Sequence, residues 1–389
     1  MRKIDRYLLR HFLQTFLICF VSLAGLYTVI DAFGRMDDFT TGRPLGEAAA
    51  TAARYYALQS LGFFNKTSGV LTLIAAMFTV TWIQRHNELT ALLAAGVPRF
   101  RVLRPILLAS LGVALGAAGV REFVLPGLRH ELSLDSKDLA GDRTVEIAPR
   151  YDNVTDVLLG GERANLATRT LLNPSFGLPP RVSAGFGKQL SAASARYLRA
   201  DGDRPAGYLL SGVTAPSGID SRDAVFAPVR AAEPGQSEPK PQPLIVTQHD
   251  APWLQPGQAF LVSGVSFDLL AAGPQWRDLA STREMVAELA NPATDLGPDV
   301  RTAVHSRLTQ PALDVTLLLV GLPLVVSRGA RSPFAAIGLS VLVVTGFFLL
   351  VLGGQALGSG GWVKPAFGAW LPLMAFAPIA AAQANTLRQ

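Results

Sequence analysis

Residues 12–30 read FLQTFLICFVSLAGLYTVI and contain no charged side chain. A helix rises 1.5 Å per residue, so about 20 apolar residues cross the ~30 Å hydrocarbon core of a bilayer. This stretch therefore predicts a transmembrane helix. Arg6 and Arg10 precede it, as basic residues precede the apolar part of a signal peptide. The apolar run is too long for a signal peptide, however, and it lacks a clear small-residue cleavage site.

Five further apolar runs predict a bundle of about six transmembrane helices. They cover residues 61–83, 103–125, 305–326, 334–355 and 367–383. The composition agrees, because 49% of the residues are hydrophobic and 16% are charged, against about 25% charged in a typical soluble domain. Prolines lie within two of these runs, at positions 311, 323, 372 and 378. They are tolerated where neighbouring helices satisfy the freed backbone groups, which favours a bundle over a lone anchor.

The basic residues between the runs indicate the orientation of the bundle. In a six-span model the segments 2–10, 85–104 and 328–331 and the terminal Arg388 all lie on one side of the membrane. An excess of Lys and Arg marks the cytoplasmic side. A five-span or seven-span model breaks this agreement. We therefore expect a multi-pass inner-membrane protein with both termini in the cytoplasm and a large extracytoplasmic region after the third span.

That region, residues 126–304, has the composition of a soluble domain. It carries 17 Lys and Arg against 21 Asp and Glu, a net charge of −4, whereas the rest of the chain has a net charge of +10. The basic residues thus lie beside apolar segments, and nucleic acid is not an expected partner. Short apolar runs between Gly, Pro, Asp and Asn clusters predict β-strands at residues 154–159, 189–198, 207–213, 244–248 and 259–269.

Such short strands favour an all-β sandwich or jelly-roll, because these architectures protect their sheet edges. Residues 233–243 are rich in Pro, Gly, Gln, Ser and Glu and predict a solvated insertion. Ser281–Leu289 predicts a short helix in which Ser281 is the N-cap and Glu284 completes a capping box. The expected domains are therefore residues 1–125 with three spans, 126–304 with the β domain, and 305–389 with three spans.

The connection between the second and third spans, residues 85–105, reads RHNELTALLAAGVPRFRVLRP. Residues 84–96 predict a short cytoplasmic helix, because Leu89, Leu92 and Leu93 recur at the spacing of one helical face. Gly96 suits a left-handed C-cap, and Pro98 follows where the helix cannot resume. A helix of this kind docks into a groove of a cytoplasmic partner or rests on the lipid headgroups. The residues alone leave both alternatives open.

Enzymatic activity is not indicated. The five histidines are dispersed along the chain, and no HExxH, GxSxG or P-loop pattern occurs. Cys19 is the single cysteine, so neither an intramolecular disulfide nor a thiolate metal site is possible. We expect no catalytic residue, no metal and no cofactor. A rival class that remains open is a membrane-anchored periplasmic ligand-binding or sensor protein without transport.

A resemblance to a known family favours docking of this helix and a transport function over the alternatives. Residues 87–97, NELTALLAAGV, resemble the signature of the LptF/LptG (YjgP/YjgQ) permeases. The opening IDRY at 4–7 with SLAG at 22–25 is similar to the LptG side of the family. The Arg-to-Pro segment 307–311 and the AWLP of 369–372 also resemble it. The sequence departs from the family pattern at Asn87, which replaces a Ser, at Pro98, and near Ser68, where a proline is missing. Six spans split evenly around a β domain are the family architecture.

The resemblance implies the permease subunit of an ABC transporter that exports lipopolysaccharide or a related glycolipid. The implied partners are a cytoplasmic ABC ATPase dimer (LptB-like), a sibling permease that completes an LptF/LptG heterodimer, and a periplasmic bridge protein. ATP hydrolysis would belong to the separate ATPase chain. The permease would extract the lipid from the inner membrane and pass it to the periplasmic β domain. The residues implied to couple it to the ATPase are Glu88, Leu89, Leu92 and Gly96.

Two basic residues are candidates for binding the lipid phosphates. Arg35 follows the first span and Lys66 lies near the start of the second. The alternative for each is to anchor the chain at the membrane interface by snorkelling. Asp314 lies within the fourth span, where a carboxylate is a functional hypothesis by default. It is expected either to pair with Arg307 or to lie near a wet cavity.

Overall fold

The structure is a computed structural model that describes residues 3–40, 44–132, 144–202, 204–226, 243–271, 273–326 and 333–388. The chain divides into two compact units, which are described separately. The membrane unit comprises Met1–Leu128 and Gly297–Gln389, and the β unit comprises Arg129–Leu296. The expected divisions were 125/126 and 304/305, so the observed ones lie three and eight residues away, because helices at both ends extend beyond the apolar runs.

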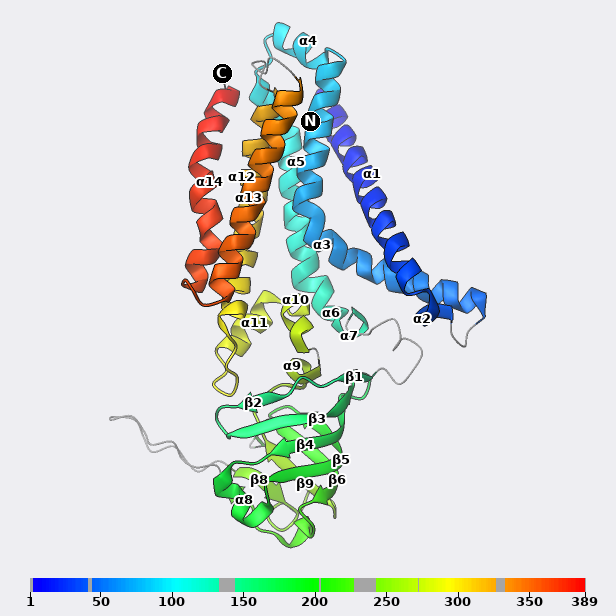
Figure 1. Ribbon diagram of the computed structural model, residues 1–389, viewed down its shortest axis with the longest axis vertical. Helices are drawn as coiled ribbons and strands as arrows, with labels where there is room; N and C mark the ends of the chain where they lie inside the picture. The colour runs from blue at the N-terminus through cyan, green and yellow to red at the C-terminus, as the bar shows by residue number, and fades with distance from the viewer. Residues whose placement is uncertain are drawn as a thin grey trace, which may run out of the picture. The chain divides into compact units, whose positions relative to one another are not determined.

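The membrane unit is helical (Figure 1). Its elements are α1 (Lys3–Gly34), α2 (Met36–Thr40), α3 (Leu45–Arg85), α4 (Glu88–Ala94), α5 (Arg99–Gly119), the π-helix η1 (Val120–Val124), α6 (Leu125–Gly127), α12 (Pro298–Val326), α13 (Pro333–Ser359) and α14 (Pro365–Arg388).

Five helices of the described residues are long and apolar enough to cross a membrane. They are Lys3–Gly34, Gly46–Arg85, Arg99–Gly127, Leu342–Ser359 and Pro365–Ala384. Apolar side chains on α1 such as Ile18 and Ile30 are about two-thirds exposed, as expected for a helix face that meets lipid. Helix α12 has 29 residues but is not one of these five, so the six-span count stays a prediction.

One difference from the sequence interpretation concerns the second span. The segment up to about Ser60 has Ala at many positions and suggests a short interfacial helix, and the apolar run after it suggests a separate span from Leu61 to Ile83. The structure has a single 41-residue helix, α3. The polar residues Asn65 and Lys66 mark a change in composition, but neither side chain breaks a helix. The Ala-rich segment and the apolar span therefore continue into each other.

A shared apolar core holds the bundle together. Leu8 and Phe12 of α1, Ile83 of α3, Ile106 of α5 and Leu317 of α12 are all buried in one cluster. Helices α13 and α14 also approach closely, since a Cβ on Gly354 would clash with the carbonyl oxygen of Gly368. Lipid tails are as apolar as leucine, so helices in a membrane associate through close packing at small residues of this kind.

The β unit contains an antiparallel sheet whose nine strands all lie within the described residues, in the order β1-β3-β4-β5-β6-β9-β8-β7 with β2 also paired to β3 (Figure 1). The strands are β1 (Thr144–Glu146), β2 (Arg150–Asp152), β3 (Val157–Asn165), β4 (Thr170–Gly177), β5 (Gln189–Leu198), β6 (Gly207–Ala215), β7 (Val225–Phe226), β8 (Pro243–Thr247) and β9 (Gln258–Val262). The predicted β region is confirmed as an antiparallel sheet, which short helices accompany. The jelly-roll arrangement stays a prediction.

Two of the five predicted strand segments need correction. The run 154–159 begins in a turn, because Asp152 Oδ1 accepts hydrogen bonds from the backbone N–H groups of Val154 and Thr155 at 2.9 and 3.2 Å. Strand β3 therefore starts at Val157. The run 259–269 ends as a strand at Val262 and continues into the helix α9 (Phe267–Ala271). Strands β1, β2, β4 and β7 were not predicted.

Short helices complete the β unit. They are α7 (Arg129–Leu132), α8 (Pro180–Phe186), α10 (Trp276–Leu279) and α11 (Thr282–Leu289). The predicted capping box is confirmed: Ser281 Oγ accepts from the N–H of Glu284, and Glu284 Oε2 accepts from the N–H of Ser281 at 2.9 Å. The predicted Pro-rich insertion 233–243 lies, except for Pro243 in β8, outside the described residues.

Candidate functional site

The predicted cytoplasmic helix is shorter than expected. Residues 84 and 85 belong to α3, and α4 starts only at Glu88, because Asn87 adopts a left-handed conformation with φ of 59°. Asn tolerates this conformation better than most residues. At the other end Gly96 has φ of 78° and closes the helix as predicted. The N–H groups of Gly96 and Val97 bond the carbonyls of Leu93 and Leu92, which is a Schellman motif.

The two faces of α4 differ in character. Leu89 is buried in the core of the membrane unit, and Leu92 and Leu93 pack against the same cluster. The leucine stripe thus holds α4 onto the bundle. Thr90, Ala91 and the C-terminal Ala94, Ala95 and Gly96 are exposed. Small side chains on an exposed helix face allow close approach of another surface.

Glu88, at the first position of α4, contacts the first helix of the chain. Tyr7 Oη donates a hydrogen bond to Glu88 Oε1 at 3.2 Å. The same region of α1 also contacts the end of α3: the His11 ring lies 5.5 Å from Trp82, which lies 4.3 Å from His86. The start of α1, the end of α3 and α4 are therefore linked by side chains.

At the other end of α1, Arg35 is part of a polar contact between helices. Its Nε donates to Asp31 Oδ1 at 3.3 Å, and Asp31 Oδ2 accepts from the hydroxyl of Tyr56 on α3 at 2.9 Å. Tyr56 packs with Tyr55 and Phe39, and all three rings are largely buried. Arg35 therefore stands beside an aromatic cluster that joins α1, α2 and α3.

Next to this cluster lies an open, almost entirely apolar cavity of about 330 Å³, called here the outer hollow. Its lining comes from α1, α2 and α3: Val29, Ala32, Phe33, Met36, Phe39, Thr40, Ala48, Ala49 and Ala52. The sequence interpretation missed it, because the Ala-rich start of α3 reads as an ordinary interfacial helix. Lys66, the second predicted phosphate ligand, lies exposed farther along α3 and does not line the hollow.

Asp314 lies inside the membrane unit. Its Oδ1 accepts a hydrogen bond from Gln310 at 3.0 Å and faces Gly69 of α3, where a Cβ would approach it to 2.5 Å. Arg307, one of the partners expected for it, instead has its Nη1 4.0 Å from Glu122 Oε1. The small residue at position 69 is what lets α3 pass the carboxylate.

The sequence interpretation also missed a polar cluster at the end of the third span. Arg121 and Glu122 stand in the π-helix η1, a type of element that is frequent at functional sites. Arg121 Nη2 donates to the carbonyl oxygen of Arg307 at 3.1 Å, and its Nε lies 3.6 Å from Glu122 Oε1. Two adjacent charged residues inside an apolar run were the available signal.

Comparison with known proteins assigns the chain to a family. The family described as lipopolysaccharide export system permease LptF/LptG matches residues 6–144 and 266–385. The matched ranges cover most of α1 and all of α3, α4, α5 and α12, as well as α9 and α11 of the β unit. A search among curated proteins found no match for the chain. With a match over more than half of its length and helices suited to a bilayer, the chain belongs to the LptF/LptG family of membrane-integral lipopolysaccharide export permeases.

Proposed function

We propose that this chain is one permease subunit of an ABC transporter that extracts lipopolysaccharide or a related glycolipid from the inner membrane. The observation that carries the proposal is the geometry of α4. Leucines hold this short helix on the bundle, and it exposes a face of small residues next to Glu88. A helix presented in this way suits a groove on a partner.

The partner in this proposal is a cytoplasmic ABC ATPase dimer. In the six-span arrangement that we propose, α4 and both termini lie in the cytoplasm and the β unit lies in the periplasm. Closure of the ATPase would move α4, and the Tyr7–Glu88 hydrogen bond and the buried Leu89 would carry this movement into α1 and the bundle core. A sibling permease and a periplasmic bridge protein complete the assembly.

The substrate route in this proposal begins at the outer leaflet. Lipid would enter between spans, with its phosphates near Arg35 and Lys66, and would be handed to the β unit. The outer hollow is apolar and lies beside Arg35, which supports contact with an acyl chain. Simple anchoring of the two basic residues at the interface is the competing outcome.

The decisive experiment is co-purification of the ATPase from native membranes with Ala91→Trp. A bulky ring on the exposed face of α4 should block docking, so the ATPase is lost while the permease still accumulates. Ala381→Trp, on an exposed position of α14, serves as the matched control. A sensor or ligand-binding protein would not retain an ATPase even without the substitution, and that result would overturn the proposal.

A further inference from the structure

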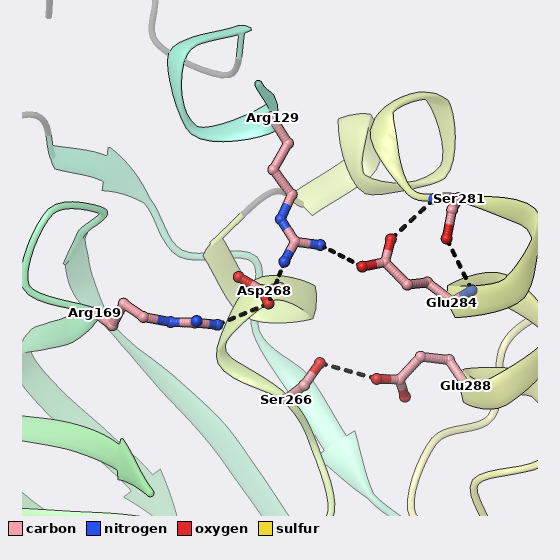
Figure 2. A network of polar contacts seen from close by, with 7 residues as sticks. All are labelled: Arg129, Arg169, Ser266, Asp268, Ser281, Glu284 and Glu288. Atoms are coloured by element: carbon pink, nitrogen blue, oxygen red, sulfur yellow. Dashed lines mark hydrogen bonds and ion pairs between the residues drawn. The ribbon is translucent and has the colours of Figure 1, made fainter. Parts of the chain in front are cut away.

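The chain connects to the β unit by two segments, and one arginine joins them. Arg129 opens α7, directly after the last residue of the membrane unit, and Glu284 lies on α11, the last helix before α12. Arg129 Nη1 donates to Glu284 Oε1 at 3.1 Å, and its Nη2 donates to Asp268 Oδ2 of α9 at 2.9 Å. Figure 2 shows the guanidinium reaching between the two carboxylates.

The geometry requires an arginine. Two nitrogens of one planar group each bind a different carboxylate, and the Arg129 side chain is only 17% exposed. A lysine ammonium is a compact point charge and does not present such a fork. The pairing therefore depends on the directions of the two N–H groups as well as on the charge.

Each carboxylate is held in place from another side. Asp268 Oδ2 also accepts from Arg169 Nη2 at 2.8 Å, and Arg169 lies over the ring of the fully buried Phe267 at 5.7 Å. Glu284 uses its second oxygen to cap α11 through the N–H of Ser281. Figure 2 shows the contacts of Arg169 with Asp268 and of Glu284 with Ser281. Arg129 thus binds two carboxylates that the fold has already positioned.

The charges of this network balance, with two guanidiniums and two carboxylates. Removal of Arg129 leaves the largely buried Asp268 with Arg169 alone and takes from the more exposed Glu284 its contact with Arg129. Breaking a buried ion pair by removing one partner is unfavourable. The contacts between the incoming and the outgoing segment are therefore expected to loosen without Arg129.

Within the membrane unit, another arginine also joins the outgoing and the returning segment of the chain. Arg121, shortly before α6, donates to the backbone carbonyl of Arg307 in α12 at 3.1 Å. The helix that leads toward the β unit and the helix that returns from it are thus joined there as well. The two contacts lie in different units and are independent observations.

We propose that Arg129 is a positioning residue that ties the two connecting segments of the β unit together, so that movements of α5 and α12 reach this unit through both connections at once. The expected effect on transport rests on the proposed function. The ion pairs of Arg129 with Glu284 and Asp268, which tie the two segments together, are a property of this chain alone.

The tie is tested by spin-label distance measurement on the full-length protein in lipid nanodiscs. Labels are placed at Leu132→Cys in α7 and Val286→Cys in α11, in a Cys19→Ser background. Arg129→Met should broaden the distance distribution between the labels. Arg277→Met is the matched control, because Arg277 pairs with its neighbour Asp278 in the same unit. Equal widths in both variants would overturn the proposal.

Lipid release per ATP hydrolysed, measured with the reconstituted transporter, tests the consequence. Arg129→Met should lower this ratio several-fold at unchanged ATPase rate, and a bifunctional maleimide that joins the two cysteines should restore it. A ratio as high as that of Arg277→Met, or no rescue by the cross-link, would contradict the role in positioning. If no ATPase binds at all, the proposed function fails while the distance measurement still decides the tie.

Arg129→Lys covers the case in which Arg129→Met does not accumulate. It keeps the charge but not the fork, so its distance distribution should be broader than that of the unsubstituted protein. A lysine variant with an unchanged distribution would overturn the proposal.

Discussion

The hydroxyl of Tyr7 donates a hydrogen bond to Glu88 Oε1 at 3.2 Å, which joins the first turns of α1 to the first residue of α4. These residues are far apart in the sequence. Through this contact the helix that exposes the small-residue face is connected to a helix whose outer surface meets lipid. The proposed coupling can therefore be tested by substitutions that remove only a few atoms.

Glu88→Ala should leave the protein in the membrane and uncouple or detach the ATPase, because both the contact with Tyr7 and any contact with the partner are lost. Tyr7→Phe removes only the hydroxyl and should lower lipid release per ATP by up to about fivefold, since one hydrogen bond contributes about 1 kcal/mol. Tyr27→Phe, whose ring stacks on Phe63, is the control. Unchanged ATPase co-purification together with unchanged lipid extraction in Glu88→Ala would refute the coupling role.

Gly354→Val should destabilise the bundle by about 1–3 kcal/mol through overpacking, because the added Cβ would meet the carbonyl oxygen of Gly368. Gly353→Val is a closely matched control, since a Cβ at that position meets nothing within 4 Å. The thermal midpoint of the detergent-solubilised protein, followed by fluorescence-detected size exclusion, distinguishes them. Equal midpoints would mean that α13 and α14 do not approach closely at this point.

Gly69→Ala should be destabilising because the methyl group would lie 2.5 Å from Asp314 Oδ1, closer than van der Waals contact allows. The double variant Gly69→Ala with Asp314→Ala should lose less stability than the sum of the two single variants, because neighbouring residues are not additive. Gly62→Ala has open space around its Cβ and is the control. Strict additivity in this cycle would count against the contact between α3 and α12.

Photo-crosslinking residues at Arg35, Lys66 and Ala49 test the lipid route. If lipid phosphates and an acyl chain lie at these places, all three sites should capture glycolipid in cells. Leu349, an exposed residue of α13, measures the background from surrounding membrane lipid. Capture no stronger than at Leu349 would leave interface anchoring as the role of both basic residues and would remove the outer hollow from the route.

What the sequence determined on its own is local. Five of the six apolar runs, the Ser281–Glu284 capping box and the Gly96 C-cap are set by residues close together in the chain, and the structure has all of them. The sequence did not predict the boundaries of α3 and α4 correctly. A change from alanine to leucine does not end a helix, whereas the left-handed Asn87 does.

The tertiary structure alone decided the contacts between distant segments. Arg129 with Asp268 and Glu284, Gly354 with Gly368, and Tyr7 with Glu88 are pairs whose members show no local pattern. Periodicity reports which face of an element is buried, but it does not report which other element covers that face. Ion pairs and close helix contacts depend on the second element, and for this reason they appear only when the chain is folded.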